Sequence, residues 1–194
     1  RALKNNITTD DVFEMVAEVS RTVSTPLVFM TYANVVYSYG IDRFFERCQD
    51  TGICGIILPD VPFEEKAEFE DAAAEYGVEF ISMVAPTSED RIDKISADAK
   101  GFIYIVSSLG VTGERSKINS NIKAVVERVR KNTDVPCAVG FGISTPEQAA
   151  EMADIADGAI VGSAIVKVVA EYGKEAPQQV GKFVKSMKEA YHVS

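Results

Sequence analysis

Short apolar runs alternate with longer amphipathic stretches along the whole chain. Six runs are apolar on both faces, as is typical of strands buried in a parallel sheet: residues 27–30, 53–58, 78–84, 102–106, 137–139 and 159–161. Stretches of helical periodicity separate them, and the strand ends recur about every 26 residues, the size of one βα unit. This alternation predicts an α/β fold with a parallel sheet covered on both sides.

Capping patterns predict where several helices begin. Thr8 and Asp11 have the spacing of a capping box, and Ser144 with Glu147 repeats it around Pro146. Further helices are expected over residues 40–52, from Pro62 to Tyr76, from Thr87 to about Ala97, up to Arg130, and from about Pro177 to Ala190.

The chain contains no linker or low-complexity segment, so residues 1–194 are expected to form a single domain. A closed barrel of βα units needs eight strands, whereas about six units are recognisable. The chain also begins at Arg1 within a helical pattern. We therefore expect a (β/α) barrel domain that lacks its first two strands.

Composition narrows the class of function. The net charge of −9 argues against nucleic acid and anionic membranes as partners, because both attract basic surfaces. No signal peptide and no run long enough to span a bilayer is recognisable. The three cysteines (Cys48, Cys54 and Cys137) are expected to be reduced core residues of a cytoplasmic protein. His192 is the only histidine, which excludes a His-based triad or a His-rich zinc site in this chain.

Two glycine-bearing segments carry the strongest functional signal. Residues 140–144 read Gly-Phe-Gly-Ile-Ser and residues 162–166 read Gly-Ser-Ala-Ile-Val, each between an apolar run and a helical pattern. Glycine lets an anion approach the backbone, and a helix N-terminus presents free N–H groups. Two such junctions in tandem predict a phosphate site.

Each polar residue at the other strand ends can be interpreted in two ways, as a structural residue or as a residue of the site. Asp60 is either the N-cap of the helix beginning near Pro62 or a substrate ligand. Tyr32 and Tyr104 are either core aromatics or site residues. The loop at 110–114, in which two glycines bracket Thr112, is either a mobile lid with a phosphate contact or a plain surface loop.

Taken together, these segments resemble the α subunit of tryptophan synthase. The motifs occur in that family's order and spacing: Met-Thr-Tyr-Ala-Asn at 30–34, Leu-Pro-Asp-Val-Pro at 58–62, Gly-Val-Thr-Gly at 110–113, and the segments at 140–144 and 162–166. The resemblance covers the whole chain. It implies a (β/α)8 TIM barrel that cleaves indole-3-glycerol phosphate to indole and glyceraldehyde 3-phosphate, without metal or organic cofactor. It also implies a β subunit that receives the indole within a heterotetramer.

The resemblance assigns roles to individual residues. Tyr104, beside the glycerol chain, is the candidate catalytic residue. The loop with Thr112 would close over the substrate, and Phe141 would pack in the pocket. Tyr32, Asn34 and Asp60 would line the indole end and the face towards the β subunit. The expected phosphate ligands are Gly113, Gly142, Gly162 and Ser163.

One part of the family's site is not matched by any motif here. The glutamate and aspartate that transfer protons in the family belong to a segment before Arg1. General acid–base catalysis is worth about 10²–10⁴-fold, so these residues alone are expected to bind without useful turnover. Two other readings stay open: a truncated barrel fragment that only binds a phosphate ligand, and another phosphosugar-converting TIM-barrel enzyme.

Overall fold

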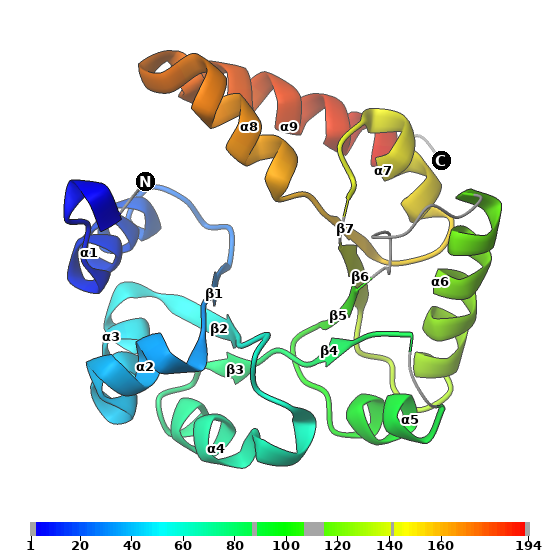
Figure 1. Ribbon diagram of the computed structural model, residues 1–194, viewed down its shortest axis with the longest axis horizontal. Helices are drawn as coiled ribbons and strands as arrows, with labels where there is room; N and C mark the ends of the chain where they lie inside the picture. Colours follow the sequence, from blue (N-terminus) through cyan, green and yellow to red (C-terminus); the bar gives the residue numbers. More distant parts are fainter. Residues whose placement is uncertain (1–2, 87–88, 107–114, 141, 193–194) are drawn as a thin grey trace. The chain divides into compact units, whose positions relative to one another are not determined.

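A computed structural model describes residues 3–86, 89–106, 115–140 and 142–192 of the chain (Figure 1). The chain divides into two compact units, unit 1 from Arg1 to Ser82 and unit 2 from Met83 to Ser194. Each unit contains its own parallel sheet with helices packed on it.

Unit 1 has a three-stranded parallel sheet in the order β1-β2-β3. In register, Met30 at the end of β1 lies opposite Ile57 at the end of β2, so both strands finish at the same edge. The elements are η1 (Leu3–Asn5), α1 (Thr9–Ser20), β1 (Leu27–Met30), α2 (Ala33–Tyr39), α3 (Ile41–Thr51), β2 (Ile53–Ile57), η2 (Phe63–Glu65), α4 (Ala67–Glu75) and β3 (Glu79–Phe80).

An aromatic cluster holds the helices of unit 1 on the sheet. The ring of Phe13 from α1 lies 5.4 Å from Phe29 of β1 and 5.3 Å from Phe44 of α3, both in edge-to-face geometry. Phe13, Phe44 and Phe45 are fully buried. Edge-to-face pairs add about 0.5–1.5 kcal/mol each to the burial of the rings, so this cluster is a principal source of stability in unit 1.

Unit 2 has a four-stranded parallel sheet in the order β4-β5-β6-β7. Ile103 and Ile105 of β5 and Val139 of β6 are fully buried, and α9 packs against α7 and α8. The elements are β4 (Met83–Val84), α5 (Glu89–Ala97), β5 (Ile103–Val106), α6 (Arg115–Val129), β6 (Cys137–Gly140), α7 (Pro146–Ala153), β7 (Gly158–Ile160), α8 (Ser163–Tyr172), η3 (Gly173–Glu175) and α9 (Ala176–His192).

The prediction of an α/β fold with parallel strands is confirmed, with two differences in the strands and helices. The strand expected over residues 78–84 is two short strands, because β3 pairs with β2 whereas β4 pairs with β5. The helix α2 was not predicted. It has only seven residues and follows β1 with hardly a break, so its periodicity is too short to recognise.

Three local predictions need correction. The N-cap of α7 is Thr145 and not Ser144, since Thr145 and Gln148 form the capping box. The helix expected from Pro62 begins as the 3-10 turn η2 before α4. Cys48 and Cys137 are buried free thiols as expected, but Cys54 is exposed, and its thiol donates to the backbone carbonyl of Leu27 at 3.3 Å.

The capping box of Thr8 and Asp11 on α1 is confirmed. Over the described part of the chain, none of the helices combines the length and the apolar character needed to cross a lipid bilayer.

Candidate functional site

In unit 1 the predicted residues Tyr32, Asn34 and Asp60 come together at the carboxyl edge of the sheet. Asp60 follows β2, and both of its carboxylate oxygens accept from the backbone N–H of Ala33, each at 3.1 Å. Ala33 is the first residue of α2, and Tyr32 and Asn34 flank it in sequence. The parallel register of β1 and β2 therefore gathers all three predicted residues at one place.

The contact of Asp60 corrects one of its two sequence readings. The 3-10 turn η2 has Pro62 at its N-cap position and receives no side-chain cap. Asp60 instead places its negative charge at the N-terminus of α2, which has no cap from Tyr32. A carboxylate there is favoured by the free N–H groups and the helix dipole. Tyr32 is 61% exposed and Asn34 is exposed, so both side chains are open to a ligand or a partner.

A cavity of about 370 Å³ lies beside Asp60 in unit 1. Tyr37 of α2 donates from its hydroxyl to Glu68 of α4 at 2.5 Å, and its ring meets Phe69 edge-to-face at 5.0 Å. That hydrogen bond to Glu68 raises the pKa of Tyr37, to which the charges of Glu68 and Glu65 add. The cavity thus combines carboxylates with aromatic walls, a combination that sequence reasoning missed because its residues come from separate elements.

In unit 2, Tyr104 lies against Gly140. Tyr104 is in the middle of β5 and only 9% exposed, and Gly140 ends the neighbouring strand β6. A Cβ on Gly140 would stand 2.6 Å from Cε1 of Tyr104 and closer still to its Cζ and hydroxyl oxygen. Gly140 is thus a glycine because the phenol ring of Tyr104 occupies the space that a side chain would need.

The Tyr104 phenol stays neutral near pH 7, because burial raises its pKa above the ordinary value of about 10. A neutral phenol can donate a hydrogen bond to a ligand but is a poor base. The site reading of Tyr104 and the core reading are both compatible with this burial.

Gly142 is a glycine for a different reason from Gly140. Its φ is +79°, a left-handed conformation that side chains disfavour, and it is exposed between β6 and α7. The following residues begin α7: Gln148 accepts from the backbone N–H of Ser144 at 2.7 Å, and the Gln148 N–H donates to Thr145 Oγ1 at 3.3 Å. The backbone therefore turns sharply at Gly142 and enters a well-capped helix.

The second glycine segment exposes a helix N-terminus. Gly162 occupies the N-cap position of α8, where no side chain caps the helix, and Ser163 is the first helical residue. Both are exposed, and no described residue lies within 4 Å of a Cβ placed on Gly162. Among the residues that the structure describes, none fills the space at the start of α8. Three predicted site residues, Thr112, Gly113 and Phe141, lie outside the described residues.

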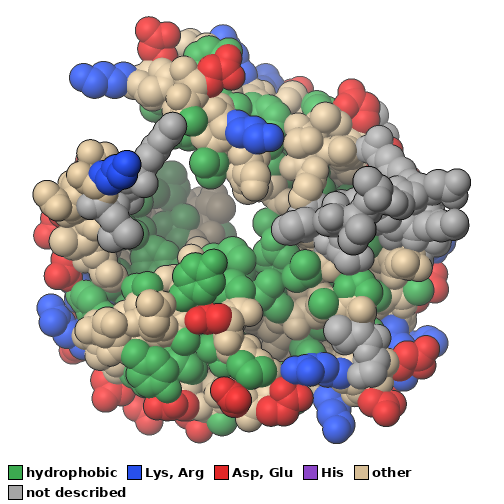
Figure 2. All heavy atoms as spheres, viewed as in Figure 1, with side chains coloured by type: hydrophobic (Ala, Val, Ile, Leu, Met, Phe, Trp, Pro, Cys, Tyr) green, Lys and Arg blue, Asp and Glu red, His purple; other side chains and the backbone are tan. Residues whose placement is uncertain are grey.

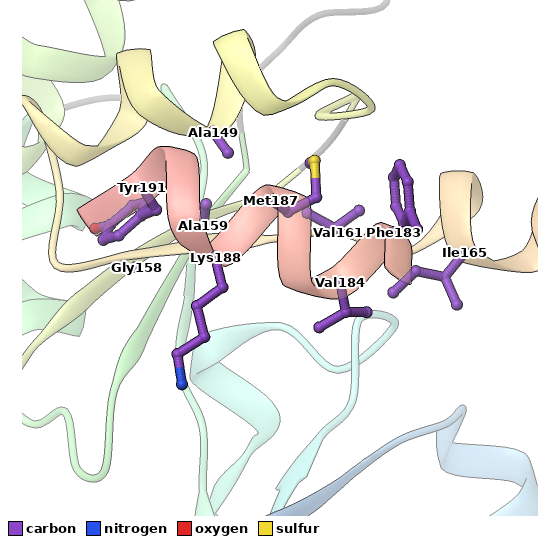
Figure 3. A pocket seen from close by; sticks show the side chains of 10 residues that line it. All are labelled: Ala149, Gly158, Ala159, Val161, Ile165, Phe183, Val184, Met187, Lys188 and Tyr191. Carbon is purple, nitrogen blue, oxygen red and sulfur yellow. The ribbon is translucent and has the colours of Figure 1, made fainter. Parts of the chain in front are cut away.

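Unit 2 also contains an apolar cavity of about 420 Å³ between β7, α7, α8 and α9 (Figure 3). In Figure 3, Phe183, Val184 and Met187 of α9 lie beside Val161 and Ile165, and Lys188 is the one charged side chain among the described residues that line the cavity. In the order of described strands, β7 has a neighbour on one side only. The cavity thus adjoins the edge strand of this sheet.

The described residues offer no cluster of three or more His, Cys, Asp or Glu side chains arranged to hold a metal ion.

Parallel βα units with site residues at the carboxyl ends of the strands are the construction of (β/α)8-barrel proteins, and the solved structures similar to this chain belong to that class. The family model described as tryptophan synthase alpha chain matches residues 1–193. The chain belongs to the tryptophan synthase alpha chain family.

Individual relatives agree with this assignment. The tryptophan synthase alpha chain of Lacticaseibacillus casei is 46% identical over 190 residues, which are 98% of this chain and 71% of the relative. The alpha subunit structure from Campylobacter jejuni has a TM-score of 0.88 at 33% identity, covering 96% of this chain and 73% of that one. A chain of the tryptophan synthase complex from Pyrococcus furiosus has a TM-score of 0.85 at 32% identity, covering 97% and 76%.

The family defines the biochemical role. Its members are lyases of tryptophan biosynthesis, and the alpha subunit cleaves indole-3-glycerol phosphate to indole. This assignment goes against the reading as another phosphosugar-converting barrel enzyme.

Proposed function

We propose that these residues form the phosphate-binding part and much of the indole-binding part of an alpha subunit acting on indole-3-glycerol phosphate. The exposed, uncapped N-terminus of α8 is the observation that carries the proposal. Free N–H groups at a helix start, with the positive end of the helix dipole, favour a phosphate. Gly162 and Ser163 would hold the phosphate there, with Gly142 at the preceding junction.

The remaining predicted ligands complete this proposal. Gly113 would join the phosphate ligands, Thr112 would close over the substrate with its loop, and Phe141 would pack in the pocket. Tyr104 would donate a hydrogen bond to the glycerol portion, in keeping with its neutral phenol. Tyr32, Asn34 and Asp60 would line the indole end and the face that a β subunit covers.

The same proposal extends to the assembly and the domain. The chain would bind a tryptophan synthase β subunit within a heterotetramer in the cytoplasm, a reducing compartment that suits its three free cysteines. The two compact units would be parts of one barrel domain. This is supported by two solved alpha-subunit structures, each of which aligns with 96–100% of this chain and therefore with both units.

A binding experiment tests the phosphate site. Isothermal titration of the 194-residue chain with indolepropanol phosphate is expected to give tighter binding than indolepropanol, which lacks the phosphate. Ser163→Glu should abolish that difference, because a carboxylate at the start of α8 repels the ligand's phosphate while remaining compatible with the helix dipole. Ser163→Ala, which keeps the backbone N–H groups, is the matched control and should lose little. Equal affinity for both ligands in the parent chain would contradict the proposal.

Turnover tests the binding-only reading separately. The family's glutamate and aspartate are matched by no motif in these 194 residues, so the chain assayed by itself should bind indolepropanol phosphate without releasing indole from indole-3-glycerol phosphate. Indole formation at a rate typical of an enzyme would refute this reading.

A further inference from the structure

The cavity beside Asp60 in unit 1 is lined by three carboxylates, all of which lie within residues 60–68. Asp60 follows β2, Glu65 lies in η2, and Glu68 lies in α4. The remaining lining residues are Ala33, Tyr37, Val61 and Phe69. The cavity of about 370 Å³ forms where this segment packs against Ala33 and Tyr37 of α2, so tertiary packing adds the tyrosine ring to the carboxylates.

Two aromatic side chains form a wall of this cavity. The Tyr37 and Phe69 rings pack at 5.0 Å with an interplanar angle of 73°, and Tyr37 remains 50% exposed. The hydrogen bond from Tyr37 to Glu68 holds that carboxylate beside the exposed ring. A cation entering the cavity therefore meets both a carboxylate and an aromatic ring.

Acidic residues predominate in the elements that carry this negative charge. Helix α4 contains four acidic residues and no basic one. Lys66, just before α4, is buried and pairs with Glu70 at 2.9 Å, outside the set of residues that line the cavity. Figure 2 shows acidic side chains gathered over α4.

We propose that this acidic–aromatic cavity receives an arginine side chain of the tryptophan synthase β subunit. A guanidinium presents five N–H donors in a planar fork, which suits several carboxylates at once, and its flat face stacks on an aromatic ring. Each carboxylate oxygen accepts more than one hydrogen bond, so Asp60 can bind a guanidinium while it accepts from Ala33. The inference rests on the proposed function, because that function places Asp60 on the face that the β subunit covers.

The lining favours a side chain of a protein over a bare metal ion. Hard cations are bound by converging oxygen ligands at roughly 2.0–2.6 Å, whereas much of this wall consists of apolar and aromatic groups. Within the described residues, the three carboxylates do not form a group placed to hold a metal. An ion pair on an exposed surface contributes little to the free energy of binding. In a concave site with an aromatic wall, water is partly excluded, and the contact between the cation and the ring is stronger.

Titration calorimetry with the β subunit from the same organism tests the interface. The double variant Glu65→Gln/Glu68→Gln keeps side chains of the same size, and the amide oxygen introduced at position 68 can still accept from Tyr37. We expect it to weaken binding of the β subunit about 10- to 100-fold at low salt and to lessen the salt dependence. The matched control, Asp71→Asn/Glu75→Gln, removes the same charge from α4 at exposed positions outside the cavity. Equal losses in both double variants would overturn the proposal.

A small probe separates the cavity from its partner. Nα-acetyl-arginine amide should shift the NMR signals of Tyr37, Phe69 and the Ala33 amide, and the uncharged citrulline analogue should not. If the arginine probe binds but the β subunit does not, the partner assignment and the proposed assembly fail while the guanidinium site stands. If neither probe shifts these signals, the site itself is refuted, even where the β subunit binds.

Discussion

Gly140 and Tyr104 show how one residue in this protein depends on another in the next strand. The missing side chain of Gly140 makes room for a buried phenol that the proposed function places beside the substrate. Gly162, in a similar sequence context, has no neighbour from the described part of the chain within 4 Å of the place where a Cβ would stand. Glycine therefore serves packing at one junction and accessibility at the other.

The variant Gly140→Ala is expected to destabilise the protein by about 1–3 kcal/mol, because its Cβ would overlap Tyr104 and force the ring to move. Thermal or urea denaturation measures this. Gly181→Ala, at an exposed position inside α9 where an added Cβ would meet no other described side chain within 4 Å, should instead stabilise by roughly 0.5–1 kcal/mol. In a parent chain that already carries Tyr104→Ala, adding Gly140→Ala should lower the stability much less than it does in the natural chain. If the penalty persists in that double variant, the overlap is not its cause.

The start of α7 shows how an element depends on one capping side chain. Sequence spacing favoured Ser144 with Glu147, whereas the helix uses Thr145 with Gln148. The two patterns differ by a single residue, and both contain a hydroxyl followed three positions later by a long polar side chain. In the structure the chain turns at Gly142, where φ is +79°, and Thr145 then occupies the N-cap position.

Thr145→Ala is expected to lower the free energy of unfolding by about 1 kcal/mol, because an N–H at the start of α7 loses its acceptor. Ser144→Ala, which removes only an exposed hydroxyl bonded to Gln148, should cost clearly less. Urea denaturation of both variants decides between the two caps. A larger loss for Ser144→Ala would restore the cap expected from sequence.

For the whole molecule, acid stability depends on carboxylates that hold separate elements together. Asp157 accepts from the backbone N–H of Cys137 at 2.9 Å and from Arg130 at 3.0 Å, so this residue just before β7 is connected to the first residue of β6 and to the residue that follows α6. The hydrogen bond from Cys137, assisted by Arg130, lowers the pKa of Asp157 in the folded state.

A folded-state pKa below the unfolded value of about 3.9 means that Asp157 stabilises the protein at neutral pH and down to about pH 4. This stabilisation is lost as the pH falls through the lower, folded-state pKa. Asp157→Asn should therefore lower the melting temperature at pH 7, and the difference from the parent chain should shrink below about pH 4. Thermal denaturation followed by circular dichroism, from acid to neutral pH, measures this difference in melting temperature, and Asp134→Asn at an exposed position is the control. A difference that does not change with pH would show that the ionised carboxylate is not responsible.

Much of this organisation was predictable because it is local. The alternation of apolar runs and helical periodicity determined that the chain folds as parallel βα units, and the order of the glycine, tyrosine and aspartate motifs determined its family. Strand runs and capping boxes are read over a few neighbouring residues, where periodicity and hydrogen-bonding geometry act directly.

Only the tertiary structure decided which residues far apart in the sequence come into contact. Asp60 binds an N–H 27 positions earlier in the chain, at the start of a helix that the sequence did not reveal. The acidic–aromatic cavity, the ring of Tyr104 over Gly140 and the exposure of Cys54 likewise depend on which strands pair and in which register. Register is set by packing across the whole sheet, and a pattern within one segment does not contain it.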